Sequence, residues 1–133
     1  MNSTVDETAL RAVASDPQYG PNSVKYIRNL FEYAACAMAM PFELAALDAN
    51  KDTLGGEAYR EARQELDRNR TSKHESAISS LATLNRMAEK LNLAPVYTGN
   101  PLDDHRGDVA HVIFTLCKHL LDEDDYGAGW TSR

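Results

Sequence analysis

The chain has 133 residues, of which 43% are hydrophobic and 26% charged, and a formal net charge of −6 at pH 7. This length and composition suit one globular domain with its own core and exclude a fibrous or largely disordered chain. The acidic balance, concentrated in the run from Asp122 to Asp125, disfavours nucleic-acid binding, which needs a clustered positive surface.

The first predicted element is a short helix. Ser3 or Thr4 can cap it, and its apolar residues recur at helical spacing to about Ala14. Asp16-Pro17 then ends it, because proline cannot continue a helix.

The second predicted helix begins at Asn22 or Ser23, either of which can cap it, and carries apolar residues up to Met38. Pro41 lacks a backbone N–H and its ring clashes with the preceding turn. The helix is therefore expected either to kink at Pro41 or to stop there and restart toward Leu47.

A loop from Asp48 to Gly56 leads into a long helical pattern over about 57–92. As one helix this segment would be about 54 Å long, whereas a globule of this size is about 35 Å across. It either breaks near Thr71, where the sequence has capping-box spacing, or stays continuous with an overhang that packs on a partner chain. We expect the continuous helix, because no glycine or proline interrupts the segment.

A connector over 92–102 follows, in which residues 95–98 suit a short extended piece without implying a sheet. The last helix starts near Asp103 or Asp104 and ends at about Leu121. The predicted fold is all-α, a small helical bundle of three main helices plus a short N-terminal helix. The domain covers residues 1–121, and we expect the acidic, then Gly-rich, tail at 122–133 to be mobile.

Polar side chains interrupt the apolar face of the long helix. This group, which we call the polar girdle, consists of Asn69, Arg70, Lys73 and His74. Buried polar groups need partners, and a facing carboxylate such as Glu32 or Glu43 would serve Arg70 and His74. Structural pairing is one interpretation of the girdle, and a ligand site is the other.

The cysteines and the hydropathy pattern bear on location and cofactors. Cys36 and Cys117 both fall within helical apolar patterns and form no CxxC pair, so we expect reduced thiols and no structural zinc site. The N-terminus lacks the features of a signal peptide, and the longest uncharged run, Tyr33 to Phe42, has about half the length of a membrane span. We therefore expect a cytoplasmic protein without membrane contact, metal or cofactor.

The sequence contains no recognisable catalytic motif. It has no Gly-rich phosphate loop, no His-Glu-x-x-His and no Glu-x-x-His pair of the kind that builds di-iron sites in helical bundles. The nearest match to such a pair is Asp108 and His111, which have the same spacing, and the sequence contains this arrangement once. The sequence thus favours a protein without catalytic activity.

Three sequence blocks resemble a known family. They are Arg70-Thr-Ser-Lys-His74-Glu-Ser-Ala-Ile78, Leu84-Asn85-Arg86 and Arg106-Gly-Asp108-Val-Ala110. Together they are similar to a family of short bacterial all-helical proteins known only as a domain of unknown function. The resemblance covers roughly Tyr59 to Leu121, leaves out the N-terminal portion with Pro41, and implies a helical fold without a particular activity.

Two hypotheses of function from different classes follow. The first is a protein–protein interaction module that binds a protein partner or self-associates as a homodimer, which the overlong helix and the acidic surface favour. The second is a small-molecule or anion site between helices, for which the candidate residues are Arg70, His74, Asn85, Arg86 and Arg106. A bacteriocin-immunity-like bundle is a further hypothesis, by size and helical class alone.

Overall fold

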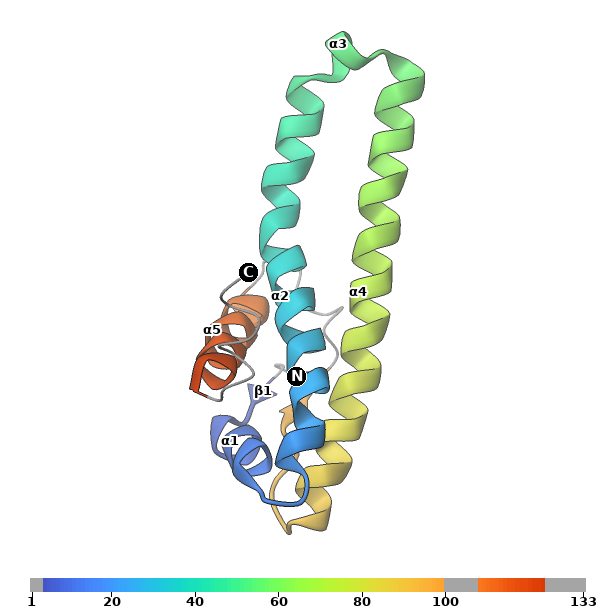
Figure 1. Ribbon diagram of the computed structural model, residues 1–133. Helices are drawn as coiled ribbons and strands as arrows, with labels where there is room; N and C mark the ends of the chain where they lie inside the picture. Colours follow the sequence, from blue (N-terminus) through green and yellow to red (C-terminus); the bar gives the residue numbers. More distant parts are fainter. Residues whose placement is uncertain (1–3, 100–107, 124–133) are drawn as a thin grey trace.

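The computed structural model describes residues 4–99 and 108–123 and has an all-α fold with one small β-ribbon. Two long helices, α2 (Gly20–Ala49) and α4 (Gly56–Lys90), run antiparallel (Figure 1). The other elements are β1 (Thr4–Val5), α1 (Glu7–Ser15), α3 (Lys51–Leu54), β2 (Tyr97–Thr98) and α5 (Asp108–Glu123). The predicted bundle of three main helices and a short N-terminal helix is confirmed.

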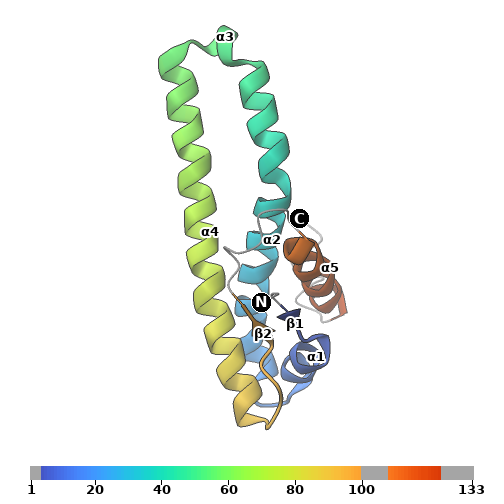
Figure 2. The same ribbon diagram turned by 180° about the vertical axis from the view of Figure 1, so that it is seen from behind.

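The molecule has two parts of different thickness. The helix α3 joins α2 to α4 at one end, while α1, α5 and the β-ribbon gather around the other end (Figures 1 and 2). We call residues 39–70 the arm and the other described residues the base. The arm consists of the last part of α2, the helix α3 and the first part of α4, so the overhang of α4 lies beside the second half of α2.

The helix α1 begins later than predicted because Asp6, not Thr4, is its cap. The Asp6 side chain accepts a hydrogen bond from the backbone N–H of Ala9 at 2.9 Å. Thr4 belongs to β1, which pairs antiparallel with β2. The extended piece at 95–98 therefore does take part in a two-stranded sheet, and Ser3 lies outside the described residues.

A tight turn leads from α1 into α2. Asp16 accepts hydrogen bonds from the backbone N–H groups of Gln18 and Tyr19, both at 2.8 Å. The helix then starts at Gly20, before the predicted caps, with Pro21 in its first turn, where proline is tolerated.

The helix α2 continues through Pro41 for 30 residues, so the predicted stop and restart does not occur. Pro41 is exposed, where water can replace the lost backbone hydrogen bond. The predicted loop after it is also shorter, since α3 forms one turn inside it before Gly55, whose φ of 87° favours glycine.

The helix α4 is continuous, as expected. It ends in a Schellman motif, in which Leu93 N–H donates to the Ala88 carbonyl at 2.9 Å and Asn92 adopts a φ of 61°. The predicted start of the last helix at Asp103 or Asp104 lies outside the described residues. That helix, α5, continues to Glu123, two residues into the predicted tail, whose remainder also lies outside them.

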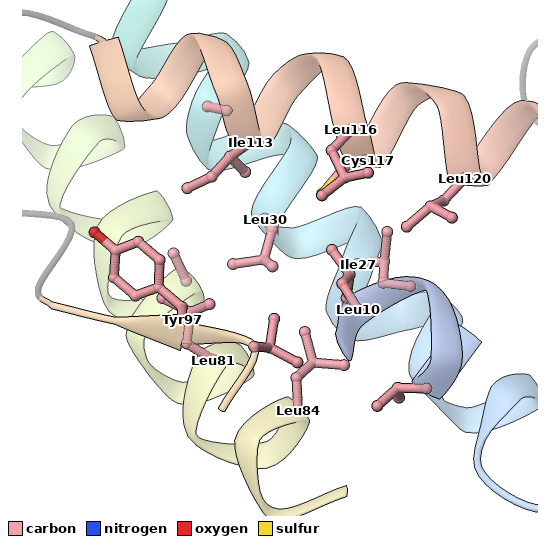
Figure 3. Packing of buried hydrophobic residues seen from close by; sticks show 14 of the residues in the cluster. Leu10, Ile27, Leu30, Leu81, Leu84, Tyr97, Ile113, Leu116, Cys117 and Leu120 are labelled. Atoms are coloured by element: carbon pink, nitrogen blue, oxygen red, sulfur yellow. The ribbon is translucent and has the colours of Figure 1, made fainter. Parts of the chain in front are cut away.

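The hydrophobic core lies in the base. In Figure 3 the labelled side chains point to a common centre from α1, α2, α4, α5 and β2. Leu10, Leu30, Leu84 and Cys117 are fully buried members of this cluster. Sites for partners or ligands must therefore be sought around the base or along the arm.

Candidate functional site

The residues of the polar girdle lie in different environments, because α4 passes from the arm into the base along this stretch. Arg70 is exposed, and its guanidinium lies 3.8 Å from the Asp67 carboxylate on the same helix. Lys73 Nζ donates to Glu32 Oε1 on α2 at 2.8 Å. Glu32 is one of the predicted facing carboxylates, but it pairs with Lys73 instead of Arg70 or His74.

His74 is the buried member of the girdle, with 8% of its surface exposed. Its Nε2 is buried and has no hydrogen-bond partner among the residues that the structure describes. The Tyr33 ring lies beside it, at 6.0 Å between centroids. No group of three His, Cys, Asp or Glu side chains in the described part of the chain is arranged to hold a metal ion. A single imidazole in this setting does not define a class of ligand.

The other predicted ligand residues lie elsewhere. Asn85 bonds to the backbone of β2 through its side-chain amide, and Arg86 is exposed and donates to Thr83 Oγ1 at 3.2 Å. Both lie about three turns from His74 along α4. Arg106 lies outside the described residues. A ligand site formed by all five residues therefore stays a prediction.

Cys36 adjoins the girdle from α2. Asn69 Nδ2 donates to Cys36 Sγ at 3.7 Å. Burial raises the pKa of the Cys36 thiol, and the Glu43 carboxylate raises it further, against the opposing effects of Lys73 and Arg70. The thiol is therefore neutral at pH 7 and lacks the thiolate character of a catalytic cysteine.

An open groove of about 790 Å³ runs between α5 and the segment formed by β1 and α1. Its volume is in the range of small-molecule pockets. Val112, which is 51% exposed, contributes apolar surface to it together with Val5 and Phe114. Its ionisable lining residues are Glu7, Arg11, His111, Lys118 and His119. Because Arg11 is paired with Glu7 at 2.8 Å, the basic groups of the groove that this carboxylate does not offset are Lys118 and the two imidazoles.

The outer face of α2 is apolar as the helix enters the arm, and it is exposed from Phe42 onward. A row of residues at steps of four, three, four and three, which we call the seam, consists of Ala35, Ala39, Phe42, Ala46 and Ala49. Phe42 is 78% exposed, Ala46 and Ala49 are exposed, and the first two alanines are half-buried. By the same helical periodicity, the buried Met40 and the half-buried Leu44 and Leu47 lie on the opposite side, toward α4.

Polar contacts fasten the two helices together near the end of the arm. Tyr59 Oη on α4 donates to Asp48 Oδ1 on α2 at 2.5 Å, and Arg63 donates to the same hydroxyl at 3.5 Å. Lys51 Nζ lies 5.1 Å from the centre of the Tyr59 ring. The bond between Tyr59 and Asp48 ties α2 to α4, and the Lys51 contact ties α3 to α4, so the seam is presented on a paired helix.

A family model described as "Protein of unknown function (DUF3232)" matches residues 21–101. The chain belongs to this family. No curated protein and no solved structure matches it.

The DUF3232 match includes nearly all of α2, the whole arm and β2, and it ends before α5. The N-terminal portion with Pro41, which the resemblance left out, is therefore part of the family match, whereas the block from Arg106 to Ala110 is not. The seam lies inside the matched region. The seam was not among the predicted site residues, although the four-three spacing of its alanines and Phe42 is visible in the sequence.

The helix α2 is also the one helix in the described ranges that is long and apolar enough, by length and composition alone, to cross a membrane. Within the apolar stretch, 22% of the residues are buried. The core helix of a globular protein can pass the same test, so the expectation of no membrane contact stays a prediction.

Proposed function

We propose that this DUF3232 protein is a non-catalytic protein–protein interaction module and that the outer face of its arm is the binding surface. The observation that carries the proposal is the 78% exposure of Phe42 in the middle of an apolar helix face. Between residues 33 and 47 the sequence has one charged side chain, Glu43. A surface helix normally turns such a face toward a core.

Covering the seam with a partner is favourable in free energy. Burying a phenylalanine side chain stabilises by about 1.5–3 kcal/mol relative to leaving it in water. A contiguous exposed apolar patch on a folded protein commonly marks an interaction site. The alanines beside Phe42 let a second helix approach closely, which suits a helical partner.

Photo-crosslinking in the native cells tests this proposal. A benzoylphenylalanine residue replaces Phe42 in one variant and the exposed Gln64 on α4 in a matched control. We expect protein adducts from position 42 and far fewer from position 64. Equal yields at both positions, or no adduct from position 42, would overturn the proposal.

A second candidate function rests on the groove beside α5. Its apolar lining beside the Lys118 ammonium suits an amphiphilic anion with a carboxylate head. Isothermal titration with decanoate tests this, with decanol and acetate as controls for the tail and the head. We expect decanoate to bind more tightly than either control and Lys118→Ala to weaken it, and equal or absent heats for all three compounds would exclude the site.

A further inference from the structure

We infer that the partner of the seam is a second copy of this chain, packed antiparallel along α2. This inference rests on the proposed function of the arm and adds the identity of the partner. A two-fold dimer needs one patch that is complementary to itself. The seam meets this requirement, because it is apolar, regular and uncharged.

The spacing of the seam is that of a coiled-coil interface. Steps of four, three, four and three keep one side of a helix facing a neighbour, and two such helices interlock side chains along their length. Four of the five seam residues are alanine. Helices with alanine at these positions approach to about 8 Å, the short end of the usual range.

The single large residue fixes the direction of pairing. In a parallel dimer in register, Phe42 would face its own counterpart, and the alanine layers on either side would be left with voids. In the antiparallel dimer each Phe42 packs over Ala39 of the second copy, and Ala35 lies opposite Ala46. The two-fold axis then passes near Met40 and Pro41, and the layers between Ala35 and Ala46 are filled.

Charge favours a second copy over a lipid surface. No lysine or arginine occurs between Ala35 and Ala49. Helices that lie in a membrane interface carry such residues on their polar face, where anionic lipids attract them. The acids Glu43 and Asp48 would instead be repelled by anionic lipid headgroups, whereas in the dimer these two exposed side chains lie off the seam and stay in water.

The length of the seam determines how strongly the two copies are expected to bind each other. Residues 35–49 extend for about 21 Å along the helix axis, so a pair of such helices forms an interface near the lower end of the specific size classes. We therefore expect a reversible dimer with a dissociation constant on the order of 1–100 μM.

Sedimentation velocity of the full chain, from about 1 to 500 μM, tests self-association across the affinity range estimated above. We expect the average mass to rise from 14.7 kDa toward twice that value. Phe42→Glu and Ala46→Glu should each keep the protein monomeric over this range, and Ala58→Glu, at an exposed alanine of α4, should leave dimerisation unchanged. All three positions are exposed, and circular dichroism checks that the variants fold.

A second measurement tests the direction of pairing. A spin label at Thr53→Cys, in a Cys36→Ser background with the buried Cys117 retained, reports the distance between the two α3 helices. The antiparallel dimer places the labels about 40 Å apart, whereas a parallel dimer brings them within about 20 Å. The short distance would overturn the antiparallel arrangement.

Three results would overturn the inference: a monomer at every concentration, a dimer that survives both glutamate variants, or binding of the chain to phosphatidylcholine–phosphatidylglycerol vesicles that Phe42→Glu abolishes. These outcomes are distinguishable from failure of the proposed function. A purified monomer whose residue 42 still crosslinks to a different protein in cells would leave the interaction module intact and remove only the second copy as its partner.

Discussion

Asn85 on α4 holds the backbone of Tyr97 through both halves of its side-chain amide. Its Nδ2 donates to the Tyr97 carbonyl at 3.2 Å, and its Oδ1 accepts from the Tyr97 N–H at 3.1 Å. The amide thus fastens β2 to the long helix, and β2 in turn pairs with β1. A residue predicted as a ligand contact therefore has a structural role that the sequence did not indicate.

Asn85→Ala should lower the free energy of unfolding by about 1–3 kcal/mol, because the mutation leaves two partly buried backbone groups without their partner. Arg86→Ala is the matched control, since Arg86 is exposed and bonds within its own helix, and it should change stability by less than about 0.5 kcal/mol. Urea melts measure both values. Equal losses for the two variants would show that the Tyr97 contact does not stabilise the fold.

Gly20 and Gly56 should respond in opposite directions to the same substitution. A Cβ at position 20 would lie 2.6 Å from the backbone oxygen of Ala14, so Gly20→Ala must displace the turn between α1 and α2. A Cβ at position 56 meets nothing within 4 Å, and this glycine begins α4. We expect Gly20→Ala to destabilise by about 1–3 kcal/mol and Gly56→Ala to stabilise by about 0.4–1 kcal/mol. Thermal melts that shift in the same direction for both variants would contradict this reading of the turn.

Substitutions of His74 measure what its buried imidazole contributes to the free energy of unfolding. Because its Nε2 has no partner among the described residues, His74→Leu should be neutral or stabilising, since it replaces the unpaired polar atom with apolar volume. His74→Ala should instead destabilise by about 1–3 kcal/mol through the cavity that it leaves. His111→Ala, at an exposed position of α5, is the control and should be nearly neutral. A loss for His74→Leu as large as that for His74→Ala would contradict this expectation, because it would show that the imidazole makes a polar contact that both variants lose.

The course of the helices was largely predictable from local signals. The absence of glycine and proline within the pattern at 57–92 correctly indicated one continuous helix. Pro41 left two outcomes open, a kink or a stop and restart, and α2 continues through it and pairs with α4. Once α2 is continuous, the overhang of α4 has a neighbour in its own chain. This packing is a tertiary contact, and the sequence of either helix taken alone does not predict it.

The polar girdle shows why burial was harder to predict than helicity. Spacing along α4 put Arg70 and His74 near one face, but the face has different neighbours at the two positions. His74 lies at the edge of the base and is buried, whereas Arg70 is in the arm and reaches water. The short strand β1 was missed for a related reason, since two residues carry no periodic signal and their partner is some ninety residues away.

Cys117 should make the protein sensitive to alkali. The thiol is completely buried in the core, and burial raises its pKa from about 9 to about 12. Between these two pH values the folded protein keeps a proton that the unfolded chain has lost. The stability associated with the neutral thiol is therefore fully present below pH 9 and is lost progressively as the pH rises toward 12, by about 1.4 kcal/mol for each pH unit.

The test is the free energy of unfolding of the unmodified chain and of Cys117→Ala at pH 8, 9, 10 and 11. Cys117→Ala should be less stable at pH 8 because it leaves a small cavity in the core. Its stability should nevertheless fall less steeply above pH 9, so the difference between the two proteins should narrow. Lysine and tyrosine titrate in both proteins and cancel in that difference. Cys36→Ala serves as a second control because Cys36 is only half-buried, and parallel curves for Cys117→Ala and the unmodified chain would show that the buried thiol does not limit alkaline stability.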